Sequence, residues 1–292
     1  MKVTLLTHTP GPERIVSAAA RLCYSDMEVQ DLLKNLTNEK VEAFIKKLND
    51  LGHQSPLEHC TFTFAIEGVS RSLTHQLVRH RLASYSQRSQ RYVNEDKFEY
   101  VTPHSISEHI EIQQMYDECM EYIQAYYEDI RDLLLLKRLE QEYGIEDYAE
   151  LNGKKEYFGD TLEAYRAYIE NGTEEQKKEY KSRINKHIKS ANEDARYVLP
   201  NACETKIIMT MNIRSLLHYF EERCCNRAQT EHRELAWEIL RICKQVSPIL
   251  FENAGPSCIR GKCKEGPMCC GNPYFKVNCV LSNSADKENA NA

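Results

Sequence analysis

The sequence predicts an α/β chain in which β-strands are mixed with longer α-helices. Three segments carry strand patterns: KVTLLT at residues 2–7, the alternating TFTFAIE at residues 61–67, and ETKIIMTMN at residues 204–212. Other segments repeat apolar residues at helical spacing, which favours helices that cover a sheet. No internal repeat or linker divides the chain, so one main domain is expected.

The first half of the chain contains two predicted helices and one predicted loop. Residues 29–51 have helical spacing and end at Gly52, a common stop for a helix. After the strand at 61–67, Ser70 is placed to cap a helix that extends to about Arg81. Residues 83–92 are rich in Ser and Gln and are expected to form an irregular binding loop.

The second half begins with a strongly periodic helix at about 106–140, followed by a charged, Tyr-rich stretch. We interpret residues of about 130–188 as a helical insertion within a domain that covers residues 1–252. A long helix is predicted at about 214–246. Residues 253–292 form a Cys-rich segment and a polar tail that is expected to be disordered.

The composition of the chain predicts in which cellular compartment the protein is found. The chain has 292 residues and no apolar stretch near the roughly 20 residues that cross a bilayer. Its first residues lack the pattern of a signal peptide, so a cytoplasmic location is expected. In a reducing compartment, the twelve cysteines are expected to be thiols or metal ligands rather than disulfides.

One segment stands apart by its charge. Residues 68–94 contain five arginines and no Asp, Glu or Lys, although the whole chain carries a net charge of −6. The arginine fork suits phosphate or the edge of a heterocycle, which indicates an anion pocket rather than a basic helix face. On a helix Arg79 and Arg81 would point about 200° apart, so they would contact two ligands or two parts of one.

The spacing of this segment resembles a known signature. Arg79-His80-Arg81, followed after seven residues by Ser89, is similar to the motif of flavin-dependent thymidylate synthases. Three further stretches resemble other blocks of that family: HQSPLEH at 53–59, ARYVLP at 195–200, and MNIRSLLHYFEERCCNRAQTEHR at 211–233. The resemblance covers roughly residues 1–105 and 190–252.

The resemblance implies a fold, a reaction and an assembly. The fold would be of the α+β type, with a central, mostly antiparallel sheet flanked by helices and a long helix in the C-terminal half. The reaction would be reductive methylation of dUMP to dTMP, with methylenetetrahydrofolate as one-carbon donor, FAD as hydride carrier and NADPH as reductant. The protein would be a homotetramer with shared active sites, and no nucleic acid, membrane or metal would take part.

The resemblance also assigns residues. The residues implied to bind FAD are His53, Ser55, Glu58, Arg79, His80, Arg81, Gln87, Asn212, Arg214, His218 and Arg227. The residues implied to bind dUMP are Gln76, Arg79, Gln87, Arg88, Ser89, Gln90, Arg91, Arg196 and Arg223. Two positions depart from the family pattern: Arg227 stands where many members have His, and Gln87 stands where several have Glu.

Arg223 is the expected catalytic residue. No Pro-Cys-His segment is present to supply a cysteine nucleophile that would add to the uracil ring. A cation at the N3/O2 edge of the ring would instead stabilise an anionic ring and push electron density to C5. Ser89 is then a binding residue, because no general base lies near it in sequence.

Two other classes of function stay open at this point. A protein that binds single-stranded nucleic acid would also combine arginines with aromatic residues, here Tyr85 and Tyr92. A zinc-dependent regulatory protein would use a cysteine cluster, although its spacing is not a standard zinc pattern. The C-terminal cysteines are Cys258, Cys263, Cys269, Cys270 and Cys279, and the first four form the candidate metal segment. Neither GxGxxG nor a Walker motif occurs, so a flavin would be held by side chains rather than by a glycine turn.

Overall fold

The computed structural model describes residues 1–92, 97–143, 173–272 and 274. Its contacts divide the chain into two compact units, one of residues 1–69, 73–86 and 206–292 and the other of residues 70–72 and 87–205. The predicted polar tail and residues 144–172 of the predicted insertion lie outside the described residues. The prediction of a single domain over residues 1–252 stays a prediction.

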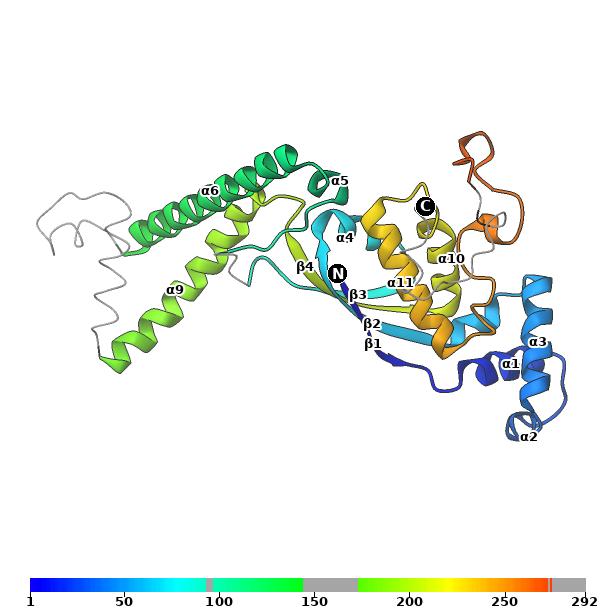
Figure 1. Ribbon diagram of the computed structural model, residues 1–292. Coiled ribbons are helices and arrows are strands. Elements are labelled where there is room, and N and C mark those ends of the chain that lie inside the picture. The colour runs from blue at the N-terminus through cyan, green and yellow to red at the C-terminus, as the bar shows by residue number, and fades with distance from the viewer. Residues whose placement is uncertain (93–96, 144–172, 273, 275–292) are drawn as a thin grey trace, which may run out of the picture. The chain divides into compact units, whose positions relative to one another are not determined.

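A four-stranded antiparallel sheet confirms the predicted α/β class (Figure 1). Its strands lie in the order β1-β2-β4-β3, and all three strand segments predicted from the sequence are present. The bounds are β1 Lys2–His8, β2 Thr61–Ser70, β3 Ala83–Gln87 and β4 Glu204–Asn212. β1 pairs antiparallel with β2, with Val3 opposite Ile66.

The main core of the first unit lies between this sheet and two helices, α10 (Ile213–Arg223) and α11 (Thr230–Val246) (Figure 1). Alternate residues of β2 are buried, as the period-two pattern predicts for a strand with one covered face. The ring of Phe62 is edge-on to the ring of Phe251, with centroids 5.7 Å apart. The core therefore joins the N-terminal strands to the C-terminal helices.

Helices α1 (Pro12–Leu22), α2 (Val29–Lys34) and α3 (Asn38–Leu51) gather beside the short helix η1 (Ser55–His59). The helix predicted over residues 29–51 is thus two helices. The hydroxyl of Thr37 accepts a hydrogen bond from the N–H of Lys40 at 3.4 Å, as a residue that caps a new helix does. α3 ends before Gly52, whose φ of 69° suits glycine.

The arginine segment is more ordered than the sequence predicted. Helix α4 (Arg71–Leu77) ends four residues before Arg81, and strand β3 stands where an irregular loop was expected. Leu82 lies between them with a φ of 62°, an uncommon value for a residue with a side chain. Because Arg79 and Arg81 lie beyond the helix, the argument from helical spacing does not apply to them.

The predicted long helix of residues 214–246 consists of α10 and α11, which are separated by residues 224–229. The guanidinium of Arg233 donates to the carbonyl of Asn226 at 3.0 Å and so stabilises this turn. Two short helices follow in the C-terminal segment, η3 (Ser257–Ile259) and η4 (Gly266–Met268).

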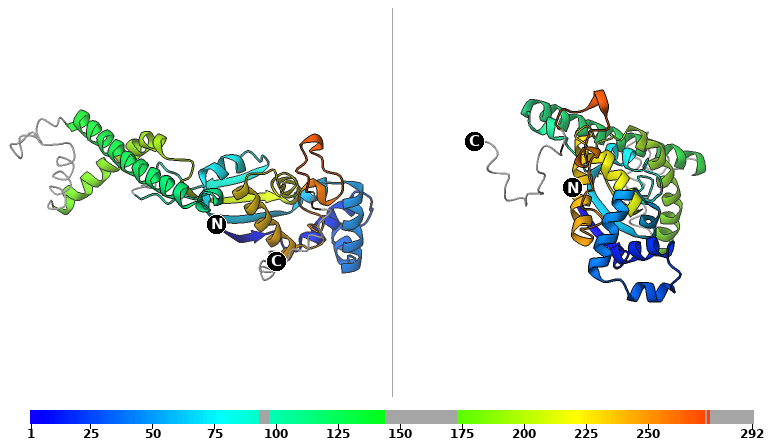
Figure 2. Two further views of the ribbon diagram at one scale, coloured as in Figure 1. Left: turned by 45° about the horizontal axis from the view of Figure 1, so that its top comes forward. Right: turned by 90° about the vertical axis from the view of Figure 1, so that its right-hand side faces the viewer.

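The second unit is built on two long helices, α6 (Ile110–Tyr143) and α9 (Glu174–Ala195), which lie side by side (Figures 1 and 2). Two short helices flank them, α5 (His104–Ser107) and η2 (Arg196–Val198). A small core of Phe98, Met120 and Cys203 packs with neighbouring tyrosines. In the part of the chain that the structure describes, no helix is both long enough and apolar enough to span a membrane.

Candidate functional site

An open pocket of about 690 Å³ lies in the first unit, and its walls come from segments far apart in the sequence. One wall is η1 with the residue before it, and a second is the turn between α4 and β3. The third wall is one side of α10 along its whole length, with Arg260 from the C-terminal segment beside it. The lining residues are Gln54, Glu58, Arg79, His80, Arg81, Leu82, Asn212, Arg214, Ser215, Leu217, His218, Glu221, Glu222, Arg223 and Arg260. The pocket therefore brings the Arg79-His80-Arg81 motif (the RHR motif) together with residues of the stretch 211–233, which also resembles the family.

The pocket has more arginines than carboxylates. Its lining contains five arginines and three glutamates, and each glutamate already has a basic neighbour. Arg214, for example, forms an ion pair with Glu58 and donates to Gln54 at 3.2 Å. Arg79 and Arg81, by contrast, form no ion pair with any residue that the structure describes. Positive charge is thus left for a bound anion.

Asn212 has a structural role in this wall. As the cap of α10, it accepts a hydrogen bond on Oδ1 from the N–H of Ser215 at 2.8 Å. The hydroxyl of Ser215 in turn donates to the carbonyl of Leu82 at 3.3 Å. These bonds tie the start of α10 to the turn that carries the two free arginines.

His80 and Arg223 form a hydrogen-bonded pair at the base of the pocket. Nε of Arg223 lies 2.9 Å from Nε2 of His80, and an arginine can only donate, so this ring nitrogen accepts. The ring proton then lies on Nδ1, 3.8 Å from the carboxylate of Glu222. Burial, aided by the charge of Arg223, lowers the pKa of His80 to about 4. His80 is therefore neutral near pH 7 and can hold the guanidinium in place.

Two more polar rings lie behind this pair. Tyr219 and His232 are both fully buried, and the ring centroid of His80 lies 5.0 Å from Tyr219 and 6.1 Å from His232. The hydroxyl of Tyr219 and both ring nitrogens of His232 have no hydrogen-bond partner in the described structure. Burial lowers the pKa of His232 to about 3, with Arg223 and His80 contributing. A neutral imidazole is the only form that this interior tolerates.

The two buried histidines predict a loss of stability in acid. In the unfolded chain a histidine has a pKa near 6.5, so below that pH the unfolded state binds protons that the folded state does not. The free energy of unfolding should fall as the pH falls from about 6.5 toward 4, by roughly 3 kcal/mol for each histidine. Urea unfolding of the wild type and of His232→Phe at pH 7 and pH 4.5 measures this loss.

His232→Phe should lose less stability between these two pH values than the wild type. His104→Gln changes an exposed histidine and should lose as much as the wild type. Equal losses in all three proteins would show that His232 does not titrate as described.

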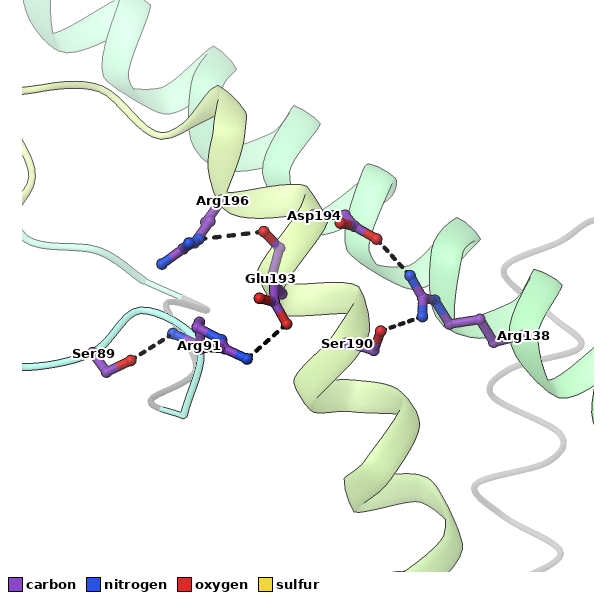
Figure 3. Close-up of polar contacts among 7 residues, drawn as sticks. All are labelled: Ser89, Arg91, Arg138, Ser190, Glu193, Asp194 and Arg196. Atoms are coloured by element: carbon purple, nitrogen blue, oxygen red, sulfur yellow. Dashed lines mark hydrogen bonds and ion pairs between the residues drawn. The ribbon is translucent and has the colours of Figure 1, made fainter.

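A second polar cluster lies within the second unit (Figure 3). A terminal nitrogen of Arg91 lies 2.9 Å from a carboxylate oxygen of Glu193, and Arg196 donates to the carbonyl of the same glutamate at 3.3 Å. The N–H of Arg91 also donates to Oγ of Ser89 at 3.3 Å. Arg91 and Arg196, which are far apart in the sequence, thus both contact Glu193, and Ser89 contacts Arg91.

The structure does not bring all the predicted FAD residues together: most line the 690 Å³ pocket, and the others lie elsewhere. Those that line the 690 Å³ pocket are Glu58, Arg79, His80, Arg81, Asn212, Arg214 and His218. His53 and Ser55 instead line a separate pocket of about 310 Å³ with Tyr24 and Phe44. Arg227 does not line either pocket and donates to the carbonyl of Met268. Gln87 belongs to the second unit, where its amide donates to Thr205 at 3.4 Å.

The predicted dUMP residues divide between the two units. Gln76, Arg79 and Arg223 belong to the first, and Oε1 of Gln76 accepts from Arg223 at 3.4 Å. The others belong to the second unit: Gln87, Arg88, Ser89, Gln90, Arg91 and Arg196. In that unit, the carbonyl of Arg88 accepts from Arg71 at 2.7 Å.

Several residues of these clusters were not predicted from the sequence. Glu193 contacts Arg91 across 102 residues of chain, and no local pattern indicates that pairing. Glu222 follows Arg214 and His218 at helical spacing on the same helix, so that signal was available in the sequence. Arg260 lies in the Cys-rich segment, for which the sequence predicted only thiols or metal ligands.

In the described structure the cysteines of that segment are not joined in disulfides, and Cys258 is buried. Among the residues that the structure describes, no group of three or more His, Cys, Asp or Glu is placed to bind a metal ion. Cys279 lies outside the described residues.

Comparison with known proteins shows which family the chain belongs to. The family model described as "Thymidylate synthase complementing protein" matches residues 4–249. A flavin-dependent thymidylate synthase of Clostridium tetani is 47% identical over 271 residues, which are 93% of each chain. One of Geobacter sulfurreducens is 43% identical over 93% of this chain and 94% of its own. One of Pyrococcus abyssi is 34% identical over 91% and 90%. This chain therefore belongs to the family of flavin-dependent thymidylate synthases.

Proposed function

We propose that this protein converts dUMP to dTMP by reductive methylation, with methylenetetrahydrofolate as carbon donor, FAD as cofactor and NADPH as reductant. The names of its relatives support thymidylate synthesis that depends on a flavin. The observation that carries the proposal is the pocket in which the RHR motif meets Arg223. The arginines and histidines of its lining suit a ligand that carries both an anionic group and a heterocyclic ring.

The side chains of the pocket fit FAD. Arg79 and Arg81 are exposed in its wall and lack carboxylate partners in the described structure, so they are available to the cofactor's phosphates. Arg214 and His218 offer further donors from α10. When bound, FAD supplies the hydride for the reduction. The protein's part is to hold and orient the ring.

Arg223 is the proposed activator of the pyrimidine. Its Nε donates to His80 and its Nη1 donates to Gln76 at 3.4 Å, so Nη2 and the second N–H of Nη1 would meet the N3/O2 edge of uracil. A cation at that edge stabilises the negative charge that develops on the ring and raises electron density at C5. Because His80 is neutral, it orients this cation without adding a second charge.

The second cluster is the proposed holder of the nucleotide phosphate and sugar. Arg91 and Arg196 contact Glu193, whose carboxylate keeps Arg91 in place, and Ser89 contacts Arg91 (Figure 3). A phosphate could replace that carboxylate as the partner of Arg91, since guanidinium binds both groups with paired hydrogen bonds. We further propose that a homotetramer forms and that its subunits share the active sites.

The test is an assay of dTMP formation by the purified full chain with dUMP, methylenetetrahydrofolate, NADPH and FAD. With all four components dTMP should form. When dUMP, methylenetetrahydrofolate or NADPH is left out, dTMP formation should fall to background, and the same should happen without FAD once bound flavin has been removed from the protein. Formation of dTMP without flavin would contradict the proposal. If oligonucleotides bind instead, with an affinity that falls steeply with salt, the nucleic-acid alternative gains support.

A further inference from the structure

The wall of the 690 Å³ pocket contains one residue from beyond the stretch that the family model matches. The family model covers residues 4–249, whereas Arg260 belongs to the C-terminal segment that follows. This segment, orange in Figure 1, lies beside α10. It adds a fifth arginine to the four that the RHR motif and α10 supply.

The segment is held by contacts on both sides of Arg260. Cys258 is buried, and its Sγ accepts a hydrogen bond from the N–H of Tyr274 at 3.4 Å. The hydroxyl of Tyr274 donates to Asn226 at 2.8 Å, and its ring lies 5.3 Å from that of Trp237. Arg260 is therefore presented to the pocket by an anchored piece of chain.

Arg227 belongs to this anchoring. It stands where the family pattern has a residue that meets the flavin, but its guanidinium donates to the carbonyl of Met268. That bond ties the turn between α10 and α11 to the segment that carries Arg260. The cation at position 227 thus holds the segment, and Arg260 supplies a cation to the pocket.

The charge around Arg260 favours an anion. Its Nη2 lies 3.2 Å from a carboxylate oxygen of Glu221, and the ammonium of Lys264 contacts the other oxygen of the same group. Two cations therefore share one carboxylate, which leaves a net positive charge at this rim. About half of the Arg260 side chain is exposed, so a phosphate can reach it.

We propose that Arg260 binds a phosphate group of a dinucleotide in this pocket, a contact made by the segment that follows residues 4–249. The proposal rests on the proposed function for the presence of such a ligand. Two sources share this chemistry, FAD and NADPH. Glu221 competes with the phosphate for Arg260.

The experiment measures two quantities for the full-length protein: the Kd of FAD by fluorescence quenching and the KM of NADPH. In Arg260→Ala one of the two should rise about tenfold, and which one rises identifies the ligand. Arg260→Lys should lose less, because it keeps the charge but not the fork. Arg241→Ala is the matched control, since Arg241 pairs with Glu238 on α11 and does not line the pocket.

A double-mutant cycle separates a contact from a general loss of structure. Glu221→Gln should tighten binding of the same ligand about two- to fivefold, and this gain should vanish in the Arg260→Ala background. Unchanged values for both ligands in Arg260→Ala would overturn the inference. If the wild type binds FAD and makes dTMP, that result leaves the proposed function intact. If the wild type does not bind FAD, both fail.

Discussion

Replacement of Arg223 by alanine should lower kcat for dTMP formation by about 10²- to 10³-fold, the usual effect of removing one donor that stabilises charge in the transition state. FAD should still bind, because the other arginines of the pocket stay in place. His80 loses its hydrogen-bond donor, and a water can take that role at the open pocket. Steady-state kinetics and flavin absorbance together measure the two effects.

The control for this variant is Arg223→Lys. Lysine keeps the charge but cannot bond His80 and the pyrimidine edge at the same time, so its kcat should lie between those of the wild type and of Arg223→Ala. A parent rate in Arg223→Ala, with normal binding of dUMP and FAD, would show that another group activates the ring.

Phe62→Ala should lower the free energy of unfolding by about 3–5 kcal/mol, the range for removing a buried aromatic ring. Phe62 is fully buried, and its ring lies against those of His8, Phe64 and Phe251. These contacts connect β1, β2 and the chain after α11, so the cavity left would open at the centre of the first unit. Urea unfolding followed by circular dichroism measures the change.

Leu6→Ala provides the comparison on the same sheet. Half of the Leu6 side chain is exposed on β1, so its loss should cost roughly 0.5 kcal/mol or less. A cost for Phe62→Ala as small as that for Leu6→Ala would contradict the described core.

Local patterns were enough to predict the fold class and much of the pocket. Strand alternation at residues 61–67 and helical spacing along α10 depend only on which faces become buried, and that information lies in neighbouring residues. The motif at Arg79–Arg81 and the polar series at Arg214 and His218 were both recognised, and the structure unites them. Breaks within helices were harder to predict, since a cap such as Thr37 competes weakly with a continuous apolar pattern.

The sequence by itself indicated an anion-binding site: it has a run of arginines without carboxylates, in an acidic chain, at a spacing that resembles the motif of flavin-dependent thymidylate synthases. Only the tertiary structure decided which side chains the predicted site residues contact. It placed Nε of Arg223 on a neutral His80, gathered Arg91 and Arg196 around Glu193, moved His53 into a separate pocket and brought Arg260 to the rim. These are contacts between residues distant in the chain, and such contacts form only when the core has packed the segments together.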